Sequence, residues 1–277
     1  MARPIYAFTT VFDDYDLLPH WCEHYRRLGV DDVVVAVGYR HDEDLNRGVW
    51  WRRCIVPDVI DICRPFDARV FVFTHCDYDA CVNDVIRPRI NEWLKLNEDD
   101  WCIYADLDEF YTYPAPIKDI AAAMEEHNDW AIEGRIIDRV VEDGSLPPVL
   151  ETPQIGLQYP IGCDLTGQWI RANTRKIVLC RARVIVNPAH DNTRNAYFHI
   201  HRIGTLADYQ AHHFRWTQRL IERLRRRVYS PGIGDIYRAE LKRFLDYWDM
   251  HRRLPVESYN PRYLGAFEYA GNETCCP

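Results

Sequence analysis

Apolar residues along the first third of the chain alternate between two spacings. PIYAFTTVF has a strand pattern, LLPHWCEHYRRLG places its apolar residues at helical spacing and stops at Gly29, and VDDVVVAVG is a second run rich in β-branched residues. Strand, helix and strand in this order are typical of a parallel crossover unit. The pattern then predicts a third strand over 68–75, a helix over 82–96 and a fourth strand over 101–110.

The second half of the chain has a looser pattern. It predicts a helix over 117–129 and strands over 130–138 and 176–188. Residues 141–175 are rich in Gly, Pro and polar side chains, which is typical of a functional loop region. Helices are expected from residue 199 onward, with the adjacent histidines of HHFRW, His212 and His213, on one of them. We therefore expect an α/β fold with a mostly parallel sheet flanked by helices, and with C-terminal helices.

Composition and charge exclude several classes of protein. A chain of 277 residues that is 47% hydrophobic can bury one sizeable core. The formal net charge of -8 argues against general binding of nucleic acid or anionic lipid. No apolar run is long enough for a membrane span, so a cytoplasmic protein is expected. The ten cysteines include no CxxC pair, which favours buried reduced thiols over a zinc site.

Three carboxylates follow the predicted fourth strand, in WCIYADLDEFY. Asp106, Asp108 and Glu109 would leave the sheet at the carboxyl ends of its strands, where α/β sheets bind their ligands. Like charges at such a place repel one another unless a cation joins them, and Mg²⁺ or Mn²⁺ held by carboxylates and substrate phosphates is a common solution. The alternative is that Asp108 and Glu109 only cap a turn or a helix.

Several segments together resemble a known family. They are DDYDLLPHWCEHYRRLGVDDVVV, NEWLKLNEDDWCIYADLDEF, GRIIDRVVEDGSLP, and KIVLCRARVIVNPAH followed by HIHRIGTLADY. With them the chain resembles the nucleotide-sugar-dependent glycosyltransferases of the GT-A fold, especially the family-2-like and family-92-like group. The resemblance covers most of residues 4–210. It implies a GT-A domain over 1–210 and a helical extension over 211–277 packed on it.

The resemblance also implies an activity, which is the metal-dependent transfer of a sugar from a UDP- or GDP-linked donor to the hydroxyl of a glycan or glycoconjugate acceptor. Carried over to this chain, Asp106 approaches the donor ribose and the Mn²⁺ or Mg²⁺ ion, Asp108 is a direct metal ligand, and Glu109 lies just behind them. A histidine after a late strand completes the metal site in such enzymes, which points to His190.

The segment around His190 departs from the family pattern. The family more often has Gly two residues before this histidine, whereas this chain has Pro188. His199 and His201 are therefore alternatives for the same role.

Other side chains are candidates for binding the donor. Arg87 and Asn91 are four residues apart on the predicted helix and share a face, although Arg87 is equally well explained as a solvated helix residue. Residues after the first and third strands are expected near the nucleotide base and ribose, or else are ordinary turn residues. These are Thr9, Thr10, Asp13 and Asp77.

An inverting transferase needs a carboxylate that takes the acceptor proton. Asp164, in the long loop region, and Asp138, at the end of a predicted strand, are the candidates. A structural ion pair with Arg139 is the alternative for Asp138. In a retaining enzyme neither needs to act as a base.

Three other functions remain open. A sugar nucleotidyltransferase also builds an α/β sheet with metal-binding aspartates, but it would be expected to open with a Gly-rich basic loop, and AFTTVFDDYD contains no glycine. A non-catalytic carbohydrate-binding protein on the same fold would be expected to lack a metal ligand. A hydrolytic metalloenzyme would be expected to show tight histidine spacing at a strand end.

Overall fold

The computed structural model describes residues 3–12, 14–39, 55–74, 86–186, 200–201, 208–229 and 235–269. The chain forms two compact units. Unit 1 consists of Met1–Arg135, Arg175–Ala211 and Glu268–Pro277, and unit 2 of Ile136–Thr174 and His212–Phe267. The predicted extension thus contributes most of its length to unit 2, together with residues 136–174, and the predicted division into domain and extension stays a prediction.

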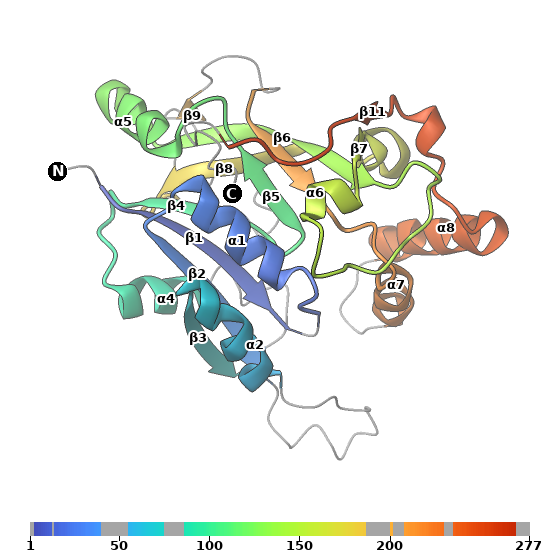
Figure 1. The fold of residues 1–277 in the computed structure, drawn as a ribbon, viewed down its shortest axis with the longest axis horizontal. Coiled ribbons are helices and arrows are strands. Elements are labelled where there is room, and N and C mark those ends of the chain that lie inside the picture. The colour runs from blue at the N-terminus through green and yellow to red at the C-terminus, as the bar shows by residue number, and fades with distance from the viewer. Residues whose placement is uncertain are drawn as a thin grey trace. The chain divides into compact units, whose positions relative to one another are not determined.

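Unit 1 alternates strands and helices along most of its length. Its strands are β1 (Ile5–Val11), β2 (Asp32–Tyr39), β3 (Arg69–Thr74), β4 (Trp101–Tyr104), β5 (Glu109–Thr112), β8 (Arg175–Arg181) and β9 (Ile200–His201), with the first halves of β6 (Ala131–Val140) and β10 (Gln210–His213). Its helices are α1 (Leu18–Leu28), α2 (Val56–Cys63), α4 (Arg87–Leu94) and α5 (Ile117–His127), with a 3-10 turn at Arg64–Phe66 (Figure 1).

The sheet of unit 1 is mixed, in the order β6-β8-β4-β1-β2-β3. Strands β4, β1, β2 and β3 run parallel to one another, whereas β8 is antiparallel to both β4 and β6. Helix α2 packs on β2 and β3 and against α1. The predicted α/β class, with a parallel sheet region flanked by helices, is confirmed.

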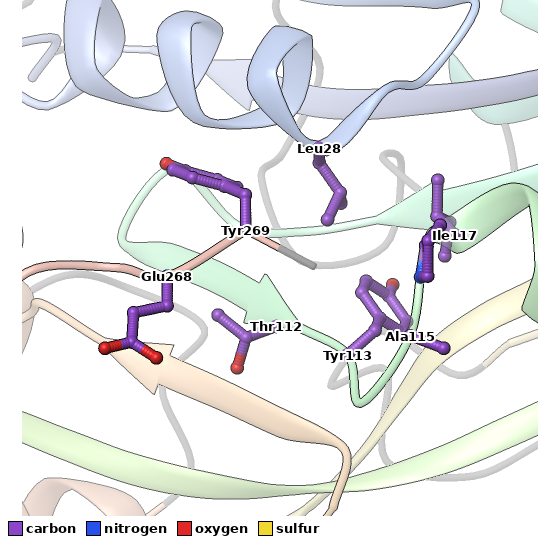
Figure 2. A pocket seen from close by; sticks show the side chains of 8 residues that line it. Leu28, Thr112, Tyr113, Ala115, Ile117, Glu268 and Tyr269 are labelled. Carbon is purple, nitrogen blue, oxygen red and sulfur yellow. The ribbon is translucent and has the colours of Figure 1, made fainter. Parts of the chain in front are cut away.

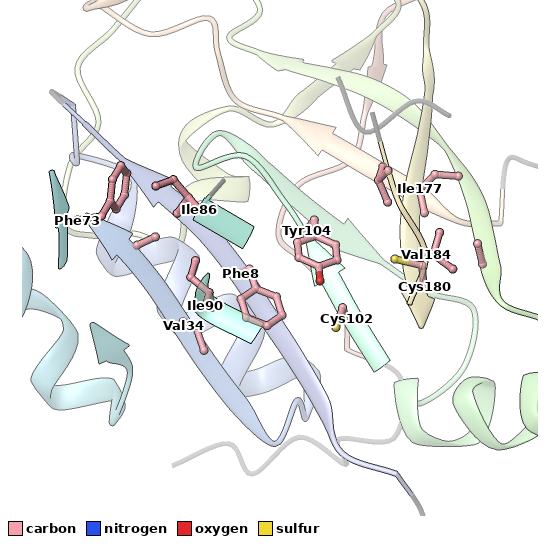
Figure 3. Packing of buried hydrophobic residues seen from close by; sticks show 13 residues of the cluster. Phe8, Val34, Phe73, Ile86, Ile90, Cys102, Tyr104, Ile177, Cys180 and Val184 are labelled. Atoms are coloured by element: carbon pink, nitrogen blue, oxygen red, sulfur yellow. The ribbon is translucent and has the colours of Figure 1, made fainter. Parts of the chain in front are cut away.

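One face of this sheet carries a core cluster (Figure 3). Phe8 of β1 stacks on Tyr104 of β4 with ring centroids 5.0 Å apart, and Cys102 lies opposite Cys180 in the β4–β8 register. Helix α4 closes the cluster with Ile86 at its N-cap and Ile90 within it, both buried. These contacts fix the place where β4 ends, and therefore where the carboxylates leave the sheet.

Unit 2 contains the second halves of β6 and β10 with short elements and two helices. These elements are α6 (Ile155–Gln158), β7 (Ile161–Cys163), a π-helical turn (Leu165–Ile170), α7 (Leu220–Val228), α8 (Asp235–His251), a 3-10 turn (Val256–Ser258) and β11 (Arg262–Tyr263). Strand β7 lies antiparallel between β6 and β11. The predicted C-terminal helices are confirmed.

Arg139 of β6 holds several backbone segments of unit 2 together. Its guanidinium donates hydrogen bonds to the carbonyls of Gly156, Tyr159 and Gly265. The side chain is 1% exposed, and Phe214 and Phe267 lie 5.3 and 5.5 Å from its central carbon. Arg139 therefore contacts main chain and aromatic rings, and the expected alternative of an ion pair with Asp138 does not describe its contacts.

One predicted element is wrong. His212 and His213 lie at the end of strand β10 and not on a helix, and both side chains are buried. The following helix, α7, begins only at Leu220.

Among the described residues, no helix has both the length and the apolar character that crossing a membrane would require.

Candidate functional site

The carboxylates of the DxD segment lie on a turn between two strands. The predicted strand 101–110 in fact ends at Tyr104, and β5 starts at Glu109. The amide of Ala105 still donates to the carbonyl of Phe8 on β1, and the amide of Glu109 donates to the carbonyl of Asp106, which closes the turn. Because β4 and β1 are parallel, this turn lies at their carboxyl edge.

The three carboxylates differ in exposure. The Asp106 side chain is 54% exposed, Asp108 is half-buried, and Glu109 is 1% exposed. The two aspartates of the motif can therefore be reached by a ligand, whereas Glu109 is enclosed by protein.

Glu109 is neutralised by a lysine that the sequence analysis missed. Lys176 Nζ lies 2.7 Å from Glu109 Oε1 and 3.8 Å from Asp106 Oδ2. The Tyr111 hydroxyl donates to Glu109 Oε2 over 2.7 Å, and the Asp106 amide donates to the same oxygen over 3.4 Å. Glu109 thus connects the lysine to the backbone of the turn.

Lys176 itself is 91% enclosed, since its side chain is 9% exposed. Burial alone lowers the pKa of its ammonium group, but the charges of Glu109 and then Asp106 outweigh burial and raise the pKa above its usual value. The sequence signal was a charged residue at the start of the otherwise apolar strand KIVLC, whose partner on β6 is Gly134.

Arg87, a predicted donor-binding residue, is buried beside this edge. Its guanidinium carbon lies 3.3 Å from the ring centroid of Tyr104, and Nη2 donates to the carbonyl of Val184 over 2.9 Å. With 8% exposure it is not a solvated helix residue, so that alternative is wrong. Its contact with the donor stays a prediction.

Two other predicted donor-binding side chains carry buried polar atoms that lack a hydrogen-bond partner among the described residues. They are Thr9 Oγ1 and Asn91 Oδ1. Buried polar atoms normally have partners, but these two have almost no accessible surface, so neither can contact a ligand without a local rearrangement. The contact of Thr9 and Asn91 with the donor stays a prediction. Thr9 and Thr10 lie within β1, not after it as expected, and Thr10 is half-buried.

Asp138 lies in unit 2 and is fully buried. Its Oδ2 accepts a hydrogen bond from the Thr166 amide over 2.6 Å, and its Oδ1 accepts from the Thr166 hydroxyl over 2.7 Å and from Trp216 Nε1 over 2.8 Å. His213 Nδ1 is 3.4 Å from Oδ1. Burial raises the pKa of the Asp138 carboxyl, but the nearby His213 imidazole and the hydrogen bonds from Thr166 outweigh burial and hold the pKa below its usual range.

Asp164, also in unit 2, caps the π-helical turn. Its carboxylate accepts from the Gly167 amide over 2.9 Å and from the Gln168 side chain over 3.2 Å. The group is half-buried. The predicted roles of Asp164 and Asp138 as proton acceptors stay predictions.

Several predicted residues fall outside the described part of the chain, namely Asp13, Asp77, His190 and His199, and the side chain of His201 is not described either. Within the described ranges, no group of three or more His, Cys, Asp or Glu side chains is arranged to hold a metal ion. The carboxylate turn presents two accessible carboxylates, Asp106 and Asp108, and their role as metal ligands stays a prediction.

A small pocket in unit 1 is not a donor site. Leu28, Thr112, Tyr113 and Tyr269 are among the residues around it (Figure 2). Its volume of about 10 Å³ is at the lower limit for a single water molecule.

The solved structures described below are distant likenesses of the chain. No protein-family model and no curated protein matches the chain. Among solved structures, a 4-diphosphocytidyl-2C-methyl-D-erythritol synthase has a TM-score of 0.37 at 15% identity, over 66% of this chain and 77% of that one. TarS of S. aureus has a TM-score of 0.37 at 12% identity, over 90% of this chain and 44% of TarS.

A UDP-glucose pyrophosphorylase in complex with UDP-glucose has a TM-score of 0.29 at 10% identity, over 96% of this chain and 92% of that one. Likenesses at these scores and identities show no shared family or reaction. The residues of this chain alone support the function proposed below.

Proposed function

We propose that the protein is a metal-dependent GT-A glycosyltransferase that transfers a sugar from a nucleoside-diphosphate sugar to an acceptor hydroxyl. The observation that carries the proposal is the pair Asp106 and Asp108, accessible on a turn at the carboxyl edge of the parallel strands β4 and β1. The resemblance of the chain to such transferases assigns these two residues to the donor site.

The carboxylate oxygens of the turn suit a hard divalent cation. Asp106 and Asp108 supply carboxylate oxygens, which Mg²⁺ and Mn²⁺ prefer, and a site with one or two carboxylates takes its other ligands from phosphate and water. When bound, such a cation stabilises the negative charge that develops on the departing diphosphate.

Two carboxylates are candidates for the proton acceptor. The oxygens of both carboxylates accept hydrogen bonds, but Asp164 is half-buried whereas Asp138 is fully buried. A base must reach the proton that it removes. We therefore favour Asp164 if the reaction inverts the anomeric configuration.

Calorimetric titration of the purified protein with UDP, GDP and their sugar conjugates, with and without Mn²⁺, tests the proposal. We expect one nucleotide to bind in a metal-dependent manner, and Asp108→Ala to weaken that binding at least about tenfold because a direct ligand is lost.

Glu126→Ala is the matched control, because it removes an exposed carboxylate on α5 away from the turn. It should bind like the wild type. A folded wild-type protein that binds none of these nucleotides would show that the carboxylates only shape a turn, and the transferase proposal would be dropped.

A further inference from the structure

The ammonium group of Lys176 lies between two carboxylates, at unequal distances from them. The distance to Glu109 is 2.7 Å and the distance to Asp106 is 3.8 Å. The first is a hydrogen-bonded ion pair, and the second is a near contact that a small side-chain rotation would close.

Glu109, the partner at the shorter distance, is held in place by burial and by hydrogen bonds. Glu109 is 1% exposed, and its other oxygen accepts from Tyr111 and from the Asp106 backbone. A buried carboxylate without a cation is strongly unfavourable. Glu109 therefore holds the ammonium group of Lys176 in place, just short of Asp106.

We propose that Lys176 is a resident counter-charge that competes with the divalent cation for Asp106, and that Glu109 sets the cation affinity of the turn by holding the lysine back. The inference rests on the proposed function, in which Asp106 and Asp108 hold the cation. Lys176 and Glu109 are positioning residues in this scheme, since neither touches the cation or the donor.

The physical reason is the mutual repulsion of two cations at one carboxylate. The repulsion grows as their separation shrinks, and it is strong in a partly buried site. Glu109→Gln keeps the shape of the side chain and an oxygen acceptor, but it removes the charge that restrains the ammonium group. Lys176 then turns to Asp106, and the divalent cation must displace it.

Manganese alone is the probe, and the electron paramagnetic resonance signal of free Mn²⁺ measures its binding without any turnover. We expect Glu109→Gln to weaken nucleotide-free Mn²⁺ binding at least about fivefold, because an uncompensated ammonium group competes for Asp106. We expect Lys176→Gln to strengthen binding by a similar factor, because the competitor is gone. Because the two variants are expected to change Mn²⁺ affinity in opposite directions, either variant alone tests the inference if the other does not fold.

The double variant Glu109→Gln with Lys176→Gln separates competition from direct ligation by Glu109. It should return to within about twofold of the wild type, since the pair is removed as a neutral unit. Glu126→Gln is the control for an exposed carboxylate and should not change the affinity.

Two results would overturn the inference while leaving the proposed function intact. One is unchanged Mn²⁺ affinity in both single variants. The other is a double variant as weak as Glu109→Gln, which would make Glu109 a ligand. If the wild type binds no Mn²⁺ even with UDP or GDP present, the proposed function fails, and the inference about Lys176 fails with it.

Discussion

The carboxylates of the turn differ in what surrounds each side chain. Asp106, Asp108 and Glu109 carry three formal negative charges, but Lys176 neutralises the buried one. Two accessible aspartates remain, which is a small ligand set for a divalent cation. We therefore expect the turn alone to bind Mn²⁺ weakly but measurably, and diphosphate oxygens to tighten the binding.

His24 on α1 is a second residue whose state is set by burial. Its Nε2 donates to the carbonyl of Tyr111 over 2.8 Å, and its Nδ1 accepts from the Tyr269 hydroxyl over 3.0 Å. Burial lowers the pKa of His24 to about 4, although the bond to the Tyr111 carbonyl acts in the opposite direction. The imidazole is therefore neutral in the folded protein at neutral pH.

This shift predicts a loss of stability in acid. The unfolded chain binds a proton near pH 6.5 and the folded protein only near pH 4, so stability is complete above about 6.5 and falls as the pH drops toward 4. Between pH 7 and pH 4.5 the histidine should account for roughly 2 to 3 kcal/mol.

The measurement is urea unfolding of the wild type and of His24→Gln at both pH values. The difference between the two proteins should shrink by that amount at the lower pH. His127→Gln, at the end of α5, is the control. A difference that does not change with pH would show that His24 is not held neutral.

At the scale of the elements, α1 ends at a residue that needs a left-handed backbone. Gly29 has φ of 90°, and its amide donates to the carbonyls of the last turn. A Cβ there would meet nothing within 4 Å, so substitution is opposed only by backbone strain. Gly29→Ala should cost about 1 kcal/mol of unfolding free energy, and Gly29→Asn less, because Asn tolerates this conformation.

Thermal unfolding of both variants checks this difference. Equal losses for Ala and Asn would show that contacts, rather than the backbone, determine the end of α1.

Periodicity identified the elements that have a clear pattern. The strands at β1, β2 and β3 and the helices at α1 and α5 lie where the spacing of apolar residues predicted them. The short polar strand β10 was predicted as part of a helix, because QAHH has no strand periodicity of its own. Pairing with β6 determines its conformation, and local sequence does not report such pairing.

At the scale of the whole molecule, residues far apart in sequence meet at Asp138. Thr166 reaches it from the π-helical turn, and Trp216 and His213 reach it from the segment before α7. Both oxygens of the carboxylate face donors. Asp138→Asn would turn an amide NH₂ toward one of them, and we expect a loss of roughly 2 to 4 kcal/mol in the stability of unit 2.

Hydrogen exchange of peptides spanning residues 161–170 measures this loss, since the Thr166 amide donates to Asp138. Asp164→Asn is the matched control and should lose less than about 1 kcal/mol, because Asn is as good a cap as Asp. Protection in Asp138→Asn equal to that of the wild type would contradict a structural role for Asp138.

The sequence allowed the α/β class and the carboxylate turn to be predicted, since both follow from local pattern. It did not indicate the contacts between distant residues. Lys176 is 67 positions from Glu109, and Trp216 is 78 positions from Asp138, so no spacing rule joins them. Such pairs become visible only when strands that are distant in sequence are placed side by side.

The contacts of Arg139 limit the substitutions that the surrounding positions can accept. Its acceptors are backbone carbonyls of Gly156, Tyr159 and Gly265, which every amino acid supplies. No other residue at position 139 could supply the same five-donor fork. Two of the acceptors are constrained as well, because a Cβ at Gly156 would lie 2.7 Å from the Gly265 carbonyl oxygen and Gly265 has a φ of 63°. Mutational tolerance should therefore be low both at Arg139 and at the two glycines whose carbonyls it contacts, so that this part of unit 2 accepts few single substitutions.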